Sequence, residues 1–311
     1  MSAATQSSSH SDDRAAQAAT NTRGIVAMVL AMAGFAISDM LLKLAGQTLP
    51  IGEIIFIRGL FASTLVILLA TVTGAMARGL KYLHSEKRQL IGLRTVAEVG
   101  ATVCFLSGLV RLPFADASAI AQFVPLAVTA AAAIFLAEPV GWRRWCATFV
   151  GFIGVMIIIK PGTSAFDPAA LWILGSMVFV VTRDLTTRQI GAEVPSLFLI
   201  SISAVAVMIS GLGFLPFETW QRPAPEQLAL IFGSAVGVLA GYYFVIMAMQ
   251  SGEIAVVAPF RYAIIIYAIA IGIVVFGERP PLSTYIGVAI VIAAGLYTLH
   301  RERVRKRRLT Q

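Results

Sequence analysis

Long apolar runs recur along the whole chain with only short connections between them. Ten such runs lie at 24–45, 51–75, 89–109, 114–136, 143–160, 169–188, 196–217, 227–249, 254–276 and 283–300. A helix needs about 20 apolar residues to cross a bilayer, because each residue adds only about 1.5 Å. Charged residues make up 13% of the chain, whereas soluble domains carry about 25%. The sequence therefore predicts an all-α integral membrane protein with ten transmembrane helices.

Positive charge is unevenly divided between the two sides of the predicted spans. With a cytoplasmic N-terminus, fifteen Lys and Arg residues fall on the cytoplasmic side and five on the other. Such residues are enriched in cytoplasmic loops, so both termini are expected in the cytoplasm. Residues 1–23, rich in Ser, Ala, Thr and Gln, are predicted to be a disordered tail. The basic tail 301–311 is interpreted as a juxtamembrane anchor in preference to a nucleic-acid-binding segment.

Motifs for enzymatic or cofactor chemistry are lacking in the sequence. Cys104 and Cys146 do not form a CxxC pair, and the three histidines are scattered among tails and loops. No phosphate-binding GxxxxGK[ST] sequence occurs. A membrane enzyme would need an activated nucleophile or a metal site within a span, and no span offers either. Neither enzymatic activity nor a metal or other cofactor is predicted.

The two parts of the chain contain matching segments. Residues 38–50 align with residues 183–195 at an offset of 145, and the offset becomes 140 near the ends of the two parts. The matched positions are Asp39 with Asp184, Lys43 with Arg188, Gly46 with Gly191, Pro50 with Pro195, and Glu138 with Glu278. The order of the matches is the same in both parts, which indicates an internal repeat.

The repeat divides the chain into halves at 24–160 and 169–300, with five predicted spans in each. Because five is odd, the second half should enter the membrane inverted relative to the first. Inverted repeats are typical of secondary transporters, whose substrate site lies near the midplane where the halves meet. Two similar halves in opposite orientation can exchange conformations, which converts an outward-open site into an inward-open one.

Ionisable side chains inside spans are costly and usually face a cavity or a partner. The charged candidates for substrate binding or gating are Asp39, Arg58, Arg94, Glu98, Arg183, Asp184 and Arg261. Pairs four residues apart are expected at Asp39–Lys43, Arg94–Glu98 and Asp184–Arg188. A network of Arg94, Asp184 and Arg261 would link the third, sixth and ninth spans. It could fix helix packing, or it could act as a gate or a receptor for an anionic group.

Uncharged polar and aromatic residues complete the predicted cavity. The selected candidates are Ser38, Gln122, Tyr243 and Tyr262, from a wider set that includes Phe35, Thr129, Tyr242, Gln250 and Tyr267. Aromatic faces could stack on a planar ligand, while Gln and Tyr could supply directional hydrogen bonds. Pro125 and Pro259 each remove a helical hydrogen bond, so kinks are expected there that face protein or a wet cavity. Glu138 and Glu278, beside tight turns, are assigned capping or turn-forming roles.

Several motifs resemble those of a known family. They are "SDMLLKL" at 38–44, "RRWCATFVGFIGVMIIIKPG" at 143–162, "APFRY" at 258–262 and "FGERP" at 276–280. With the two five-span halves, they resemble the ten-span EamA-type members of the drug/metabolite transporter superfamily over about 24–300. The resemblance implies a bacterial inner-membrane transporter of small metabolites without ATPase chemistry. "APFRY" and "WCATFVGFIGV" are most similar to uptake-type members such as S-adenosylmethionine and riboflavin transporters, whereas "LAEP" departs from the commoner "LGE" turn.

The sequence analysis thus predicts a secondary transporter that works by alternating access. Its expected substrate is amino-acid-like, nucleoside-derived or a vitamin, and its expected surroundings are the lipid bilayer, without nucleic acid. An amino acid or drug exporter of the same family is an alternative, and a channel or structural membrane protein is an alternative of another class. Proton coupling through Asp39 or Asp184, exchange and facilitated diffusion all stay open, as does the choice between monomer and homodimer.

Overall fold

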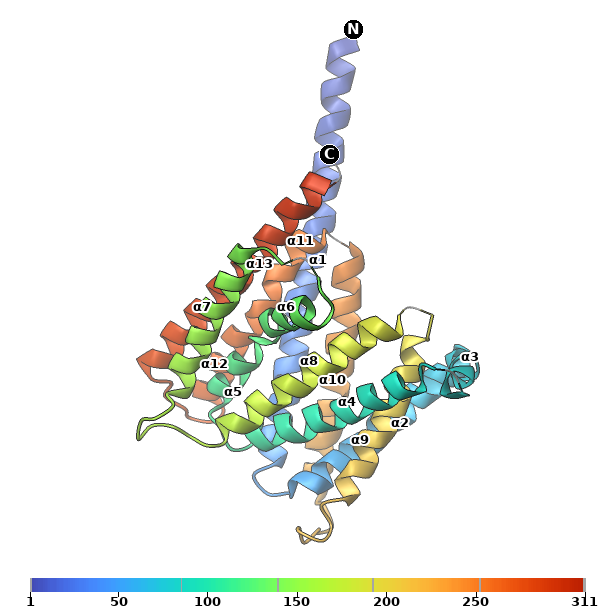
Figure 1. Cartoon of the computed structure of the whole chain (residues 1–311), viewed down its shortest axis with the longest axis vertical. Coiled ribbons are helices and arrows are strands. Elements are labelled where there is room, and N and C mark those ends of the chain that lie inside the picture. Colours follow the sequence, from blue (N-terminus) through green and yellow to red (C-terminus); the bar gives the residue numbers. More distant parts are fainter. Residues whose placement is uncertain (1, 85, 139, 192, 252, 310–311) are drawn as a thin grey trace.

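The computed structural model describes residues 2–84, 86–138, 140–191, 193–251 and 253–309, without the side chains of 2–19, 84, 254–255 and 302–309. Every regular element within these ranges is a helix (Figure 1). The helices of the first half are α1 Ser2–Ala45, α2 Ile51–Val72, α3 Ala75–Leu80, η1 Lys81–His84, α4 Arg88–Leu109, α5 Phe114–Ala121, α6 Val124–Phe135 and α7 Trp142–Ile159. Those of the second half are α8 Ala170–Ile190, α9 Ser196–Leu212, α10 Pro225–Ser251, α11 Ile254–Val257, η2 Ala258–Tyr262, α12 Ala263–Val274 and α13 Leu282–Leu309.

Each predicted span coincides with helical structure, but the spans differ in length. Among the described residues, eight helical segments are long and apolar enough to cross a membrane. The seventh and ninth predicted spans are shorter apolar helices, Ser196–Leu212 and Ala258–Val274. The chain is therefore a multi-pass helical membrane protein. A full count of ten crossings stays a prediction, because the two shorter helices fall below the length that spans a bilayer unaided.

Helix α1 is longer than its predicted span and continues back to Ser2, projecting beyond the bundle (Figure 1). The sequence predicts a disordered tail over residues 1–23, and the structure differs from that prediction by placing 2–23 in the helix. Alanine is frequent in this segment and favours helix. A stretch without tertiary contacts is nevertheless marginal as a helix in water, so disorder away from the bundle stays a prediction.

Both prolines singled out in the sequence lie at breaks in a span. Helix α5 ends at Ala121 and α6 starts at Val124, with Pro125 in the first turn of the new helix. In the second half, α11 gives way to the 3-10 helix η2, which contains Pro259, before α12 begins at Ala263. Proline removes a backbone donor and crowds the preceding turn, which explains both breaks. The fourth span of each half therefore consists of separate helical pieces.

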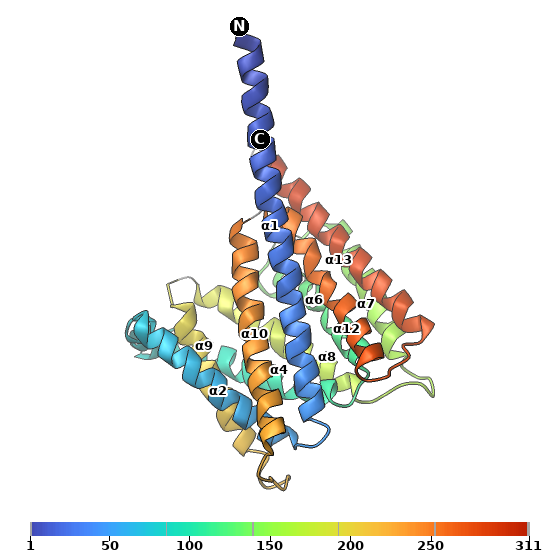
Figure 2. The ribbon, with the colours of Figure 1, turned by 180° about the vertical axis from the view of Figure 1, so that it is seen from behind.

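The helices pack in pairs that respect the internal repeat. Helix α1 packs along α10, α4 along α8, α2 along α9, and α7 along α13. Exchanging the two halves converts the α1–α10 contact into the α8–α4 contact and returns the other two pairs to themselves. Figure 2 shows α1 and α10 side by side on one face, whereas Figure 1 shows α4 and α8 on the opposite face. The packing is thus that of two similar five-helix halves.

Close approach of α1 and α10 depends on small residues. A Cβ atom added to Gly34 would lie 3.0 Å from the carbonyl oxygen of Gly237 and 3.0 Å from the amide nitrogen of Gly241. These backbone contacts leave no room for a side chain, so glycine sets the distance between the helices. Beside them, the hydroxyl oxygens of Ser38 and Ser234 lie 3.0 Å apart and are buried. Asp39, the next residue, points about 100° away around the helix and is half-buried.

Candidate functional site

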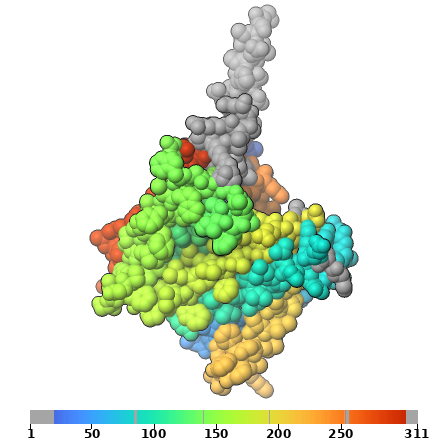
Figure 3. Space-filling view, in the orientation of Figure 1, coloured from blue at the N-terminus to red at the C-terminus, as the bar shows by residue number. Residues whose placement is uncertain are grey.

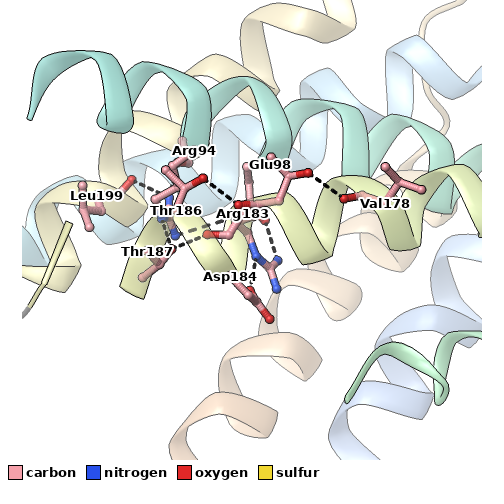
Figure 4. Close-up of polar contacts among 10 residues, drawn as sticks. Arg94, Glu98, Val178, Arg183, Asp184, Thr186, Thr187 and Leu199 are labelled. Atoms are coloured by element: carbon pink, nitrogen blue, oxygen red, sulfur yellow. Dashed lines mark hydrogen bonds and ion pairs between the residues drawn. The ribbon is translucent and has the colours of Figure 1, made fainter. Parts of the chain in front are cut away.

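A charged network joins α4 to α8 (Figure 4). Arg183 on α8 donates to Glu98 on α4, with 3.3 Å between Nη1 and Oε1. The Nε of Arg183 also donates to its neighbour Asp184 at 2.9 Å. The side chains of Arg183 and Glu98 are about one quarter exposed, and that of Asp184 is 37% exposed. The network is therefore partly exposed and is not sealed in apolar packing.

Arg94 belongs to the same network but is fixed differently. It lies 3.8 Å from Glu98, which confirms the pair predicted from their spacing along the helix. Its guanidinium also donates to the hydroxyl of Thr187 at 3.0 Å and to that of Ser203 at 2.6 Å. A longer bond of 3.4 Å reaches the carbonyl of Leu199. With partners on α4, α8 and α9 and little exposure, Arg94 holds three helices together.

A second charged pair faces this network from the opposite layer. Asp39 on α1 and Arg58 on α2 interact electrostatically with each other. Both also interact with the phenol of Tyr242 on α10, as do Glu98 and Arg183. Tyr242 therefore lies within electrostatic range of charged groups from both layers. Its side chain is 58% exposed.

An aromatic wall adjoins the charged groups. The rings of Tyr242 and Phe35 are 5.2 Å apart and meet edge to face. A Cβ atom on Gly241 would lie 2.7 Å from the Phe35 ring, so this glycine makes room for the aromatic pair. An edge-to-face pair presents one ring face to a neighbouring group. We refer to Phe35, Asp39, Arg58, Glu98, Arg183, Asp184 and Tyr242 as the central cluster.

The remaining predicted site residues are distributed outside the central cluster. Ser38 is buried against Ser234 in the helix contact, and Gln122 lies half-buried at the break between α5 and α6. Tyr243 is 65% exposed, and its ring contacts its neighbour Phe244. Tyr262 is 5% exposed and lies in the apolar core. These positions stay candidates by prediction only.

Arg261 is exposed at the end of η2 and belongs to none of the ion pairs in the described part of the chain. The predicted network of the third, sixth and ninth spans therefore differs from the observed one, whose ion pairs among the described residues join the third span to the sixth. The 3-10 geometry of η2 turns Tyr262 inward, where its hydroxyl packs on Gly295, and leaves Arg261 outward. Arg183 supplies the cation that the sequence analysis assigned to Arg261.

The predicted local pairs Asp39–Lys43 and Asp184–Arg188 are wrong. Lys43 instead pairs with Glu278, with 3.6 Å between Nζ and Oε1. Arg188 pairs with Glu138, with 2.9 Å between Nη1 and Oε1. Because Lys43 matches Arg188 and Glu138 matches Glu278 in the repeat, the two pairs correspond to each other. Each joins the end of the first helix of one half to the turn after the fourth span of the other half.

The Lys43–Glu278 pair is part of a larger contact at the end of the bundle away from the chain termini (Figure 1). Both carboxylate oxygens of Glu278 accept from the backbone N–H of Phe114, at 2.7 and 2.8 Å. Lys43 donates to the carbonyls of Leu109 and Leu112, and its ammonium lies 5.3 Å from the Phe276 ring centre. The contact joins α1, the corner between α4 and α5, and the turn after α12.

A separate apolar cavity of about 590 Å³ lies among α4, α6, α7 and α8. Its walls include Phe123, Phe135, Phe152, Leu174 and Val178. Figure 3 shows the face on which α7 and α8 lie. Large apolar side chains of these helices are exposed, among them Phe149, Phe152, Leu171 and Val178. This composition suits contact with lipid tails, and no member of the central cluster lines the cavity. The polar site and this apolar cavity are therefore different places.

Comparison with known proteins identifies what this arrangement belongs to. The EamA-like transporter family matches residues 22–160 and 167–299, one half in each match. An S-adenosylmethionine uptake transporter of Rickettsia prowazekii (strain Madrid E) is 26% identical over 286 residues, which cover 91% of this chain and 95% of that protein. A riboflavin transporter of Rhizobium johnstonii is 27% identical over 216 residues, covering 69% and 71%.

Two further matches extend the comparison. A pseudopaline exporter of Pseudomonas aeruginosa (strain UCBPP-PA14) is 27% identical over 277 residues, covering 87% of this chain and 94% of that protein. A solved crystal structure matches with a TM-score of 0.60 at 16% identity, covering 91% of this chain and 99% of the other. The structural match concerns the fold alone.

Proposed function

The chain belongs to the EamA-like transporter family, and on that premise we propose that it takes up a small metabolite of the S-adenosylmethionine type. The proposed carrier lies in a bacterial inner membrane with both termini cytoplasmic. It has ten crossings arranged as two inverted five-helix halves. The charge distribution of the sequence supports this orientation. The paired helix packing supports the two-half arrangement.

The observation that carries the proposal is the chemistry of the central cluster. Asp39, Glu98 and Asp184 supply three carboxylates, and Arg58 and Arg183 supply two guanidinium forks. S-adenosylmethionine carries an amino group, a carboxylate, a sulfonium cation and an adenine ring. Carboxylates suit the two cationic groups, and a guanidinium suits the carboxylate through two parallel hydrogen bonds. With Arg94, which pairs with Glu98, three guanidinium groups balance the three carboxylates, so the site offers both signs of charge to a ligand that carries both.

The aromatic wall completes the match to such a ligand. A sulfonium over the face of Tyr242 would gain cation–π attraction of about 0.5–2 kcal/mol. The adenine ring could alternatively stack on Phe35 or Tyr242, as planar ligands do on aromatic side chains. The cluster residues come from α1 and α2 of the first half, α4 of the first half, and α8 and α10 of the second half. A site shared by both halves changes its access when the halves move.

Counterflow into proteoliposomes tests the proposal. Vesicles loaded with unlabelled S-adenosylmethionine should accumulate external labelled S-adenosylmethionine transiently, and S-adenosylhomocysteine should compete more weakly because it lacks the sulfonium charge. Methionine, adenosine and riboflavin serve as competitors that each present one part of the chemistry. Equal competition by riboflavin would redirect the substrate assignment. Currents without saturable counterflow would indicate a channel, and a dependence on an imposed pH gradient would indicate proton coupling.

Export is the second candidate function, because the pseudopaline exporter covers nearly as much of the chain as the uptake transporter does. The same central cluster could bind an amino-acid-like product leaving the cell. Net flux is measured in right-side-out and inside-out vesicles with only a substrate gradient as the driving force. The comparison shows whether the carrier transports equally well in both directions. Accumulation in intact cells, compared with loss from preloaded cells, then decides the physiological direction.

A further inference from the structure

We infer that the pairs Lys43–Glu278 and Arg188–Glu138 are two alternating locks, one at each end of the transport route. Both ion pairs are formed in the structure, but Lys43–Glu278 is buried and Arg188–Glu138 is exposed, so we call the first lock closed and the second open. The inference rests on the proposed alternating access but not on the identity of the substrate. It assigns a gating role to four residues outside the central cluster, all of them joined by repeat-related contacts.

The turns that carry the two glutamates have the same backbone conformation. Ala137 has φ of 52°, and Gly277, its counterpart at the offset of 140, has φ of 63°. The next N–H in each turn donates backward across the helix end, from Glu138 to the Ala132 carbonyl at 3.3 Å and from Glu278 to the Gly272 carbonyl at 2.8 Å. Both are helix C-termini closed by a left-handed residue. The repeat therefore presents each glutamate in the same way.

The two pairs differ in how far they are buried. The side chains of Lys43 and Glu278 are 10% and 15% exposed, and backbone groups of the α4–α5 corner occupy their remaining polar positions. The side chains of Arg188 and Glu138 are 50% and 48% exposed. The two pairs are related by the internal repeat, yet only one of them is buried. A carrier whose two locks close in turn would show this difference in any single conformation. With cytoplasmic termini, this conformation is sealed on the outside and open toward the cytoplasm.

Two aromatic rings pack beside the closed lock, and the repeat identifies the residues that correspond to them at the other lock. The rings of Phe114 and Phe276 are 5.6 Å apart beside Glu278. At the offset of 140, Phe276 corresponds to Leu136, and Phe114 corresponds to position 254. In the opposite conformation we therefore expect the turn at Leu136 to approach position 254, while Phe276 leaves Phe114. Arg188 and Glu138 would then be buried as Lys43 and Glu278 are now.

One difference between the locks concerns the residue under each glutamate. A Cβ atom on Gly272 would lie 2.6 Å from Glu278 Oε2, so glycine makes room for the folded carboxylate. The corresponding residue in the other half is Ala132, whose methyl group occupies that space. Glu138 must extend further outward to close its lock. This difference favours closure at the Lys43 end, which is the closure observed.

Paired cysteines measure the two closures directly. In a background with Cys104→Ser and Cys146→Ser, one protein carries Phe114→Cys with Phe276→Cys, and a second carries Leu136→Cys with Ile254→Cys. A short bifunctional thiol reagent is added to each in proteoliposomes. Adding Glu278→Gln should lower the 114–276 yield and raise the 136–254 yield, changing their ratio about tenfold, because a charge-assisted bond is lost. Glu138→Gln should change the ratio in the opposite direction.

Two milder variants cover the case in which a glutamate variant fails to fold. Gly272→Ala should weaken the Lys43 lock by crowding Glu278, and Ala132→Gly should strengthen the Arg188 lock by making room for Glu138. Both should raise the 136–254 yield. A 136–254 yield that stays at background in all four variants, while 114–276 stays high, would overturn the inference. Crosslinks that alternate without counterflow of any tested solute would refute the substrate assignment and leave the locks supported.

Discussion

Arg183 and Glu98 connect the third span of one half to the first span of the other, with 3.3 Å between Nη1 and Oε1. The same guanidinium holds Asp184 at 2.9 Å through Nε. A single fork thus organises two carboxylates that are open to the interior. An arginine in this position can exchange one protein carboxylate for the carboxylate of a ligand without leaving a buried charge unpaired.

Replacing Arg183 by lysine should impair binding while keeping the charge. Lysine cannot present two parallel donors to one carboxylate, so affinity in counterflow should fall by about tenfold or more. The measurement is the concentration of substrate that gives half-maximal counterflow. Arg261→Lys is the matched control, since Arg261 is exposed and outside the central cluster. Equal effects of the two substitutions would remove Arg183 from the site.

Neighbouring tyrosines on α10 offer a sharper comparison. Tyr242 contacts Phe35 and the charged groups, whereas Tyr243 contacts Phe244. Tyr242→Ala should reduce substrate affinity about fivefold to thirtyfold, from the loss of about 1–2 kcal/mol of aromatic and cation–π contact. Tyr243→Ala should leave affinity within twofold of the wild type. Tyr242→Phe separates the ring from the hydroxyl, and retained affinity there would assign the effect to the ring.

Arg94 should be needed for stability more than for transport. It has partners on α8 and α9 and is 8% exposed. Arg94→Leu would leave the hydroxyl of Ser203 and the carbonyl of Leu199 without their donor, which should lower the free energy of unfolding by about 2–3 kcal/mol. The detergent-induced unfolding curve reports this change. A variant of normal stability that has lost binding would instead place Arg94 among the substrate contacts.

The glycines in the contact between α1 and α10 should not tolerate replacement by larger residues. Gly34→Leu forces a side chain into backbone that lies 3.0 Å from its Cβ position and should destabilise the protein by about 1–3 kcal/mol. Gly92→Leu is the control, because nothing lies within 4 Å of a Cβ atom there. Thermal unfolding monitored in the same detergent compares the two. Similar midpoints for both variants would contradict a tight α1–α10 contact.

The spans, the halves and their matching residues could be read from the sequence because apolar length and repeated order are local properties. The partners of Lys43 and Arg188 could not. Spacing along one helix favoured Asp39 for Lys43, yet Lys43 lies in the last turn of α1 and reaches the corner beyond it. Two carbonyls of the α4–α5 corner and a carboxylate of the turn after α12 meet there, and that meeting depends on the tertiary arrangement.

The sequence also could not show which of two adjacent tyrosines on α10 lies near the charged groups. Tyr242 and Tyr243 differ by about 100° around the helix axis, and apolar surroundings on every side of α10 give no amphipathic signal to choose between them. Pro259 correctly predicted a break, but the break produced a 3-10 helix that rotates Arg261 outward and Tyr262 into the core. A change of helical period alters the direction of every side chain that follows it.

The break at residues 122–123 has a consequence for the surrounding bilayer. Glu278 holds only α5, which is 8 residues long, while α6 continues as a separate piece of 12 residues. A continuous span would have to tilt as one rigid helix, and the surrounding lipids of both leaflets would have to rearrange with it. Two pieces allow one leaflet to stay in register with the protein while the other rearranges. If α6 moves during turnover while α5 stays held, the work done against lipid packing would fall mainly on a single leaflet.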